Sequence, residues 1–201
     1  MNVNRKFRST AIIIFNLSIA ADVSADQNTG ELDGIYNLRR GWAESQEIGA
    51  SPNPGEPVEQ IGRYRVTLDR RDWPLLPPAE KKRIRRVLTI SGVFRGELVQ
   101  YIGQNPLFDH ALGNDDRTGA VYTENDTLVA PPKIVPCGPP GLVTISGVEQ
   151  INPIKGIGIY SNLRRSKILA NVTVNQCTLQ NDLQFIPEVS YLCFEGSTIC
   201  P

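Results

Sequence analysis

Short apolar segments with alternating polar residues recur along this chain and leave little room for helices. The segments are rich in β-branched residues, and clusters of Gly, Pro, Asn and Asp separate them. This is the pattern of half-buried strands bounded by turns. The segments are 64–68, 87–93, 98–102, 120–123, 142–148, 156–160 and 172–179. The pattern predicts a mainly β fold.

One segment carries a helical signal instead. Pro78 suits the first turn of a helix, and Ile84, Val87 and Leu88 follow at helical spacing. The sequence therefore predicts one short helix near residues 78–87.

Two β architectures fit the strand pattern. Within residues 161–183, apolar residues such as Leu163 and Ile168 recur every four to six residues, and Asn residues lie between them. Short strands with Asn at the corners are typical of β-helix-like coils. An antiparallel β-sandwich with several hairpins predicts nearly the same spacing. Both alternatives stay open on the sequence alone.

The first 25 residues have the layout of a cleaved secretory signal. A basic start within residues 1–8 precedes a short apolar core, residues 10–21, and small residues end at Ala25, before Asp26. The apolar core is too short for a membrane span, which needs roughly 20 residues. We expect a mature chain that begins near Asp26, is exported to the periplasm or the extracellular space, and has no transmembrane span after cleavage.

The remaining residues, 26–201, are enough for one domain with a full core. The chain is 40% hydrophobic and 21% charged, which is typical of a folded globular protein. We expect a single β-rich domain. The Pro-rich loop 129–141 is the candidate for a subdomain break, because its prolines exclude a central strand.

All four cysteines lie in the last third of the chain. An even number of cysteines in an exported chain predicts two disulfide bonds. Three pairings are open, and the most local of them joins Cys193 to Cys200 and Cys137 to Cys177. We prefer that pairing only because it is the most local.

Positive charge is concentrated in one part of a chain that is neutral overall. The chain has 21 basic and 21 acidic residues, but residues 63–95 hold ten basic residues and three acids. The densest run consists of Lys81, Lys82, Arg83, Arg85 and Arg86. This run is a candidate surface for an anionic glycan or lipid, and the alternative is a solvated face balanced by acids elsewhere. The sequence has no nucleic-acid-binding motif or aromatic ladder, so nucleic acid is not an expected partner.

His110 is the only histidine, and this excludes metal sites built from several histidines. No G-x-S-x-G elbow supplies a nucleophile for a catalytic triad. We therefore interpret His110 as a surface or structural residue, and the sequence predicts no catalytic residue and no organic cofactor.

Four carboxylates near one polar loop are candidate ligands for a calcium ion. They are Asp115, Asp116, Glu124 and Asp126, and their oxygens are the hard ligands that Ca²⁺ prefers. The absence of flanking helical patterns excludes an EF-hand. The alternative interpretation is a tight hairpin turn, for which Asp, Asn and Gly are also the expected residues.

Two classes of function remain. The first is an exported β-rich binding or structural protein of the cell envelope or extracellular space, with no catalytic activity. The second is a carbohydrate-active enzyme on a β scaffold, either a glycoside hydrolase or a polysaccharide lyase. The separation of acid pairs is a three-dimensional fact. A groove lined by aromatic rings, with two close carboxylates, would favour the enzyme.

Overall fold

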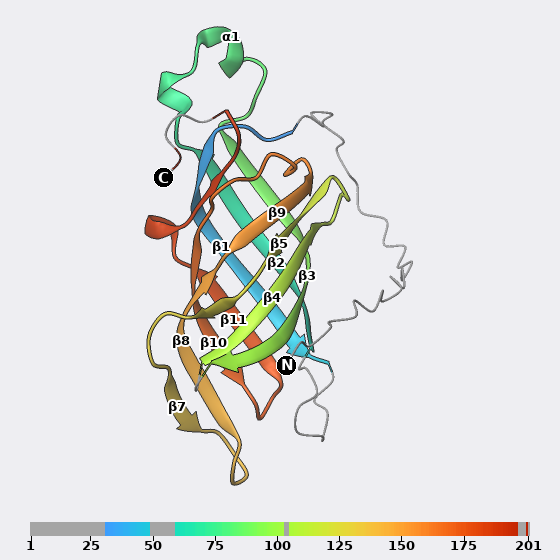
Figure 1. Ribbon diagram of the computed structural model, residues 1–201, viewed down its shortest axis with the longest axis vertical. Helices are drawn as coiled ribbons and strands as arrows, with labels where there is room; N and C mark the ends of the chain where they lie inside the picture. Colours follow the sequence, from blue (N-terminus) through green and yellow to red (C-terminus); the bar gives the residue numbers. More distant parts are fainter. Residues whose placement is uncertain (1–30, 49–58, 103–104, 197–199, 201) are drawn as a thin grey trace, which may run out of the picture.

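The computed structural model describes residues 31–48, 59–102, 105–196 and 200 (Figure 1). The predicted secretory signal lies outside these residues. The structure is 62% strand and 7% helical, which confirms the mainly β prediction. The described part of the chain contains no helix with the length and apolarity needed to cross a membrane.

Twelve strands and three short helical turns follow one another along the chain. The strands are β1 Ile35–Glu47, β2 Glu59–Arg70, β3 Val87–Ile102, β4 Asn105–Asn114, β5 Gly119–Thr123, β6 Asp126–Leu128, β7 Lys133–Pro136, β8 Val143–Ile151, β9 Pro153–Gly158, β10 Ile168–Asn175, β11 Gln180–Phe185 and β12 Tyr191–Cys193. The helical turns are η1 Trp73–Leu75, α1 Pro78–Lys81 and η2 Pro187–Val189.

Eight of the strands form a closed antiparallel barrel. Their order is β3-β2-β1-β11-β10-β8-β6-β4, and the pairing of β3 with β4 closes the ring. Neither the sandwich nor the β-helix is confirmed. The segment with regularly spaced Asn residues forms the antiparallel pair β10–β11, whereas β-helix coils would pair in parallel. Closure leaves the barrel ring without an unpaired edge.

Glycines and bulges let long strands bend around the barrel. A Cβ at Gly62 would collide with the carbonyl oxygen of Glu44, and a Cβ at Gly92 with that of Gly113. The register of β1 against β2 shifts near Leu38, as a β-bulge does. Such positions are where a twisted sheet can turn sharply enough to close.

The other four strands are attached to the barrel. β5 pairs with β4 and carries β9, while β12 pairs with β1 and β7 with β8. The Pro-rich loop 129–141 contains β7, and the strands that flank it, β6 and β8, are neighbours in the barrel sheet. β7 lies at one end of the barrel and α1 at the other (Figure 1).

The predicted helix is much shorter than expected. α1 covers only Pro78–Lys81, and Val87 already pairs with Asp69 at the start of β3. The prediction of a helix to residue 87 was wrong in extent, because Val87 and Leu88 pair with β2 as strand residues.

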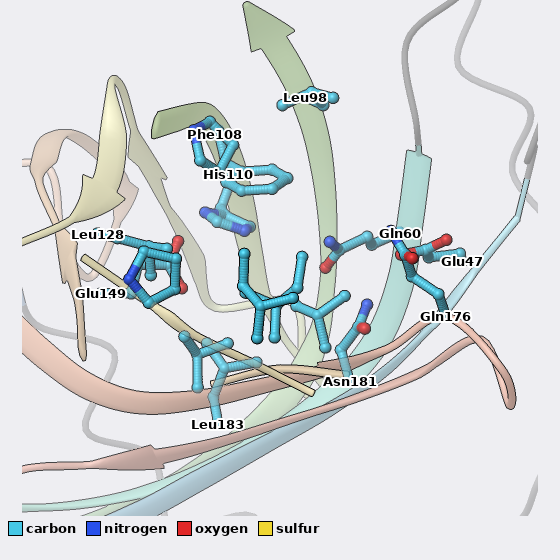
Figure 2. Close-up of a pocket in the computed structure, with 16 residues that line it drawn as sticks. Glu47, Gln60, Leu98, Phe108, His110, Leu128, Glu149, Gln176, Asn181 and Leu183 are labelled. Atoms are coloured by element: carbon cyan, nitrogen blue, oxygen red, sulfur yellow. The ribbon is translucent and has the colours of Figure 1, made fainter. Parts of the chain in front are cut away.

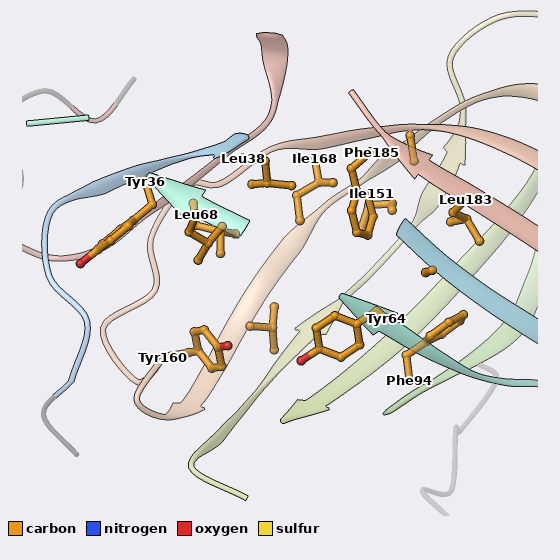
Figure 3. Close-up of a cluster of buried hydrophobic side chains, with 14 of the residues drawn as sticks. Tyr36, Leu38, Tyr64, Leu68, Phe94, Ile151, Tyr160, Ile168, Leu183 and Phe185 are labelled. Atoms are coloured by element: carbon orange, nitrogen blue, oxygen red, sulfur yellow. The ribbon is translucent and has the colours of Figure 1, made fainter. Parts of the chain in front are cut away.

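We call the barrel end nearest α1 the closed end (Figure 1). Aromatic rings are packed there with aliphatic side chains, and Figure 3 shows Tyr36 and Tyr160 within this buried cluster. Phe194 is fully buried, with Tyr36 edge-on at 5.9 Å and Tyr160 stacked at 6.4 Å between ring centroids. The hydroxyls of Tyr64 and Tyr160 both donate to Asn114 Oδ1, each at 2.9 Å. The buried phenol groups are therefore paired, as buried polar groups generally are.

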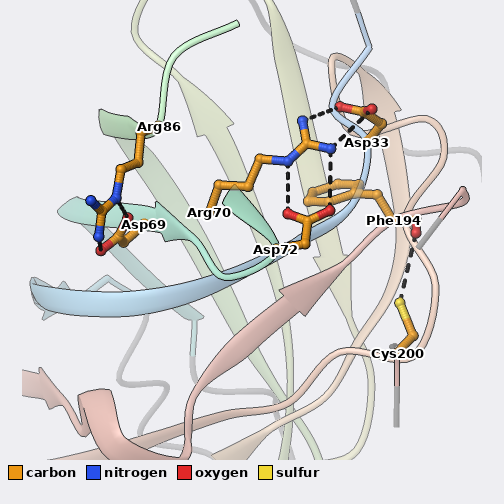
Figure 4. Close-up of polar contacts among 7 residues, drawn as sticks. All are labelled: Asp33, Asp69, Arg70, Asp72, Arg86, Phe194 and Cys200. Carbon is orange, nitrogen blue, oxygen red and sulfur yellow. Dashed lines mark hydrogen bonds and ion pairs between the residues drawn. The ribbon is translucent and has the colours of Figure 1, made fainter. Parts of the chain in front are cut away.

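Arg70 is buried at the same end between two aspartates (Figure 4). Only 3% of its side chain is exposed, and it forms ion pairs with Asp33 at 2.7 Å and Asp72 at 2.8 Å. Its guanidinium also lies 5.9 Å from the centre of the Tyr36 ring. Each carboxylate faces two guanidinium nitrogens, which is the strong bidentate form of this interaction.

The cysteines lie at disulfide distance in two pairs. Cys137 pairs with Cys177, with Cα atoms 6.1 Å apart, and Cys193 with Cys200, with Cα atoms 5.9 Å apart. This is the most local of the three pairings. The first pair ties the loop after β7 to the turn after β10, and the second holds the chain end beside Phe194.

Candidate functional site in the barrel lumen

A cavity of about 200 Å³ occupies the other end of the barrel, which we call the open end (Figure 2). All eight barrel strands contribute to its wall. Ten lining residues are apolar: Leu98, Pro106, Phe108, Leu128, Pro132, Ile134, Ile145, Val172, Val174 and Leu183. Six are polar or charged: Glu47, Gln60, His110, Glu149, Gln176 and Asn181. The cavity is thus a mainly apolar space with a few polar groups around it.

The polar residues come from several strands of the barrel, and those within strands stand at inward positions. Alternate residues of a strand point to the same face, so Asn181 shares the inner face with Leu183 and Phe185, and Glu149 shares it with Ile151. Sequence reasoning missed Glu149, Gln60 and Asn181. The sequence does contain a signal for them, because each is a polar residue at a strand position that alternation assigns to the buried face.

His110 belongs to a buried hydrogen-bond network. Its Nδ1 lies 2.6 Å from Asp126 Oδ2, and Thr123 Oγ1 donates to the same oxygen. The backbone N–H of Asn152 donates to the other oxygen, Oδ1, at 2.6 Å. Asp126 is fully buried, and both of its oxygens are engaged.

The network favours a charged imidazole. Burial alone would lower the pKa of His110, but the hydrogen bond to Asp126 and the negative field of Glu149 outweigh it, so the pKa is raised. A protonated imidazole donates from both ring nitrogens, and Asp126 neutralises its charge. Of the two interpretations of His110, a surface residue and a structural one, the structure excludes the first, because the ring is buried in the barrel.

Glu149 is the second titratable group in the lumen. It lies opposite Leu128 on one side and Ala170 on the other. Burial raises its pKa to about 7, with the charge of His110 lowering it and that of Asp126 raising it. Its carboxyl group is therefore poised between the neutral acid and the carboxylate near neutral pH.

Glycine at position 96 makes space for the imidazole. Gly96 lies directly opposite His110 in the β3–β4 pair. A Cβ there would stand 2.7 Å from Cδ2 and 2.9 Å from Nε2 of the ring. The rings of Phe108 and Phe94 flank the imidazole, with centroids 6.1 and 6.0 Å away, so these neighbours fix its orientation.

A second polar group lies across the cavity. Ser45 donates to Gln60 Oε1 at 3.2 Å, and Asn181 Nδ2 donates to Ser45 Oγ at 3.3 Å. Asn181 Oδ1 is buried and has no hydrogen-bond partner. Figure 2 shows Gln60 and Asn181 on one side of the apolar lining and Glu149 on the other. An unpaired buried acceptor is costly, and a donor supplied from outside the chain would satisfy it.

His110, Asp126 and Glu149 have the residue types of a metal site. Their ligand atoms lie within 4.8 Å of one another, and they form the one such group among the described residues. However, His110 Nδ1 and both Asp126 oxygens are already hydrogen-bonded. These hydrogen bonds occupy the lone pairs with which these two side chains would otherwise bind a cation.

The structure separates the four carboxylates predicted to bind calcium. Asp115 accepts from Ser91 and pairs with Arg63 at 3.4 Å, and Asp116 accepts from Thr118 within the turn. Strand β5 then runs between this turn and Glu124, a distance of roughly 17 Å at the usual rise per residue. Asp126 lies inside the barrel. The calcium ion itself stays a prediction.

The basic run lies on the segment between β2 and β3, at the closed end. Arg86 pairs with Asp69 at 3.0 Å, and Lys81 Nζ donates to the carbonyl oxygen of Pro74 at 3.4 Å. Lys82, Arg83 and Arg85 are exposed. α1 is too short to place Lys81 and Arg85 on one helical face. Anion binding by Lys81, Lys82, Arg83, Arg85 and Arg86 stays a prediction, and the run is far from the cavity.

No protein-family model, curated protein or solved structure matches this chain. Function must therefore be argued from the cavity and its chemistry.

Proposed function

We propose that this chain is an exported binding protein whose barrel holds one small, largely apolar molecule at its open end. The observation that carries the proposal is a lumen cavity to which all eight strands contribute, with ten apolar residues among its sixteen lining residues. Barrels of about eight strands are wide enough to hold one small ligand, and ligand sites are mostly apolar with a few placed polar groups.

The volume limits the ligand. A cavity of about 200 Å³ is somewhat larger than the roughly 150 Å³ that holds benzene in an apolar protein interior. It suits a single ring with a short side chain. Export is supported by the signal-like layout of residues 1–25 and by two cysteine pairs at disulfide distance.

A binding role explains the cavity better than a purely structural role does. The closed end demonstrates that this barrel can fill its lumen with side chains. The cavity gives the carbohydrate-active alternative little support, because Phe108 is the one phenyl ring in its wall and both oxygens of Asp126 are engaged.

Calorimetric titration with 2-phenylethanol tests the proposal. We expect saturable 1:1 binding to the wild-type protein and none to Val174→Trp, which fills the lumen with an indole ring. Val93→Trp places the same ring on the outer face of β3, where Val93 is exposed, and should bind as the wild type does. Absence of binding, or equal binding by the Val174→Trp variant, would overturn the proposal.

A further inference from the structure

Resting on the proposed function, we propose that the cavity selects a cation: a small apolar molecule that carries a protonated amine. The basis is the set of charged and hydrogen-bonding side chains that line the cavity. Two carboxylates, Glu47 and Glu149, line the cavity with the single His110, and its lining has no Lys or Arg. The cavity wall therefore has more acidic than basic side chains.

Among the charged groups at the cavity, one carboxyl group has no partner of opposite charge. Asp126 and His110 are 2.6 Å apart and neutralise each other. Glu149 lies beside this pair and has no other cationic neighbour in the cavity wall. A buried carboxylate without a counter-ion is expensive, so the empty site keeps a proton on Glu149 for part of the time.

An ammonium group completes the arrangement. When it enters, the Glu149 carboxyl releases its proton to solvent, and the carboxylate accepts an N–H from the ligand. The lumen then holds two neutral pairs, His110 with Asp126 and the ammonium with Glu149. No covalent bond forms or breaks in the ligand.

The site also holds acceptors for the N–H groups of such a ligand. An ammonium has three N–H donors and no acceptor. Asn181 Oδ1 is a buried acceptor without a partner, and Glu47 at the end of β1 supplies a further carboxylate. The wall thus offers acceptors beyond Glu149 to an amine-bearing ligand.

Other ligand classes use the site less well. A carboxylate ligand would add a negative charge beside Glu149 and Asp126, and only His110 would oppose the repulsion. An alcohol of the same shape has one donor and no charge. The three classes therefore predict an order of affinity: ammonium, then alcohol, then carboxylate.

Calorimetric titration at pH 8 with 2-phenylethylammonium, 2-phenylethanol and phenylacetate tests this order. We expect the ammonium to bind at least about tenfold more tightly than the alcohol, which is the range of a hydrogen bond to a charged group. Phenylacetate should bind most weakly. If the alcohol or the acid binds as tightly as the ammonium, the inference fails while the proposed function stands. If none of the three binds, both fail.

Glu149→Gln tests the assigned residue. The variant should lose about tenfold or more in affinity for the ammonium and keep its affinity for 2-phenylethanol within twofold. Asp182→Asn removes the same charge from the exposed face of β11 and should leave both affinities unchanged. An unchanged ammonium affinity in Glu149→Gln would overturn the inference. The ligand ranking in the wild-type protein tests it independently of how the variant folds.

Discussion

Arg70 at the closed end and Glu149 at the open end are both buried charged residues of one barrel, yet their surroundings differ. Arg70 has two carboxylate partners, in ion pairs of 2.7 and 2.8 Å. Glu149 has no dedicated cation and lines a cavity. The closed end pairs its buried charge within the chain, whereas at the open end, among the described residues, Asn181 Oδ1 has no hydrogen-bond partner and Glu149 has no cation of its own.

Packing follows the same division. Among the aromatic and apolar side chains that fill the closed half, the cavity is about 50 Å³ and its lining is almost entirely apolar, against about 200 Å³ at the open end. The lumen is therefore packed more tightly at the closed end than at the open end. Substitutions at the two ends should have different consequences.

The largest effect on stability should come from the disulfide near the open end. Cys137 and Cys177 close a loop of 40 residues, and Cys193 and Cys200 one of seven. Because a longer loop loses more unfolded-state entropy, replacing the first pair by serine should cost roughly 4 kcal/mol and the second roughly 2 kcal/mol. Urea unfolding of both double variants measures this. A larger loss for the Cys193–Cys200 pair would contradict this dependence on loop length.

Arg70→Met should be the most damaging single change at the closed end. It leaves Asp72 buried without its partner, and we expect a loss of roughly 3 kcal/mol, the lower end for a broken buried pair, because Asp33 is 57% exposed. Arg65→Met, on the exposed face of the same strand, should change stability by less than about 0.5 kcal/mol. Equal effects in urea unfolding would show that the Arg70 cluster contributes little.

At the open end, removal of a polar group should stabilise the protein. Asn181→Leu eliminates a buried acceptor that has no partner and adds apolar contact. The free energy of unfolding should rise by about 1 kcal/mol, while affinity for 2-phenylethylammonium falls. Asn171→Leu, at an exposed position on β10, should give no such gain. A destabilised Asn181→Leu protein would mean that this residue serves the fold.

Stability should also depend on pH. The pKa of Glu149 is about 7 in the folded protein, above its ordinary value of 4.5, so the folded state binds this proton more tightly than the unfolded state. Stability from the neutral carboxyl is present at low pH and is lost as pH rises towards 7. The raised pKa of His110 acts in the same direction.

Glu149→Gln isolates the contribution of Glu149. Glutamine has no charge to bury, so the stability of the variant relative to the wild type should increase from pH 5 to pH 8. Thermal unfolding at several pH values measures the difference. A difference that does not change with pH would show that Glu149 is not buried as described.

Local pattern predicted strands in the regions of β2, β3, β5, β8, β9 and β10, but it did not predict β1, β4 or the closure of the barrel. Alternation specifies which residues of β10 and β11 point inward, and it is the same in a sandwich and in a barrel. Closure depends on the pairing of β3 with β4 and of β1 with β11, and the latter joins residues more than 130 positions apart. No local rule encodes such a pairing. Val87 and Leu88, which have helical spacing from Ile84, instead pair with β2 as strand residues.

The cavity was even less accessible to sequence reasoning. His110 is a lone histidine in the sequence, and its partner Asp126 stood among the calcium candidates. Only the fold brings these two residues together with Glu149 from β8. What the sequence did contain was a polar residue at an inward position of several strands, such as Gln60, Glu149 and Asn181, and that pattern indicates a partly polar lumen once the barrel is known.

Mapping amide chemical-shift changes on the ¹⁵N-labelled protein during titration with 2-phenylethylammonium tests the division between the two ends most directly. The account predicts the largest changes at the open end, around His110, Glu149 and Val174, with the amides of Tyr36 and Phe194 unmoved. Changes centred on the closed end or on residues 81–86, or no changes at all, would contradict it.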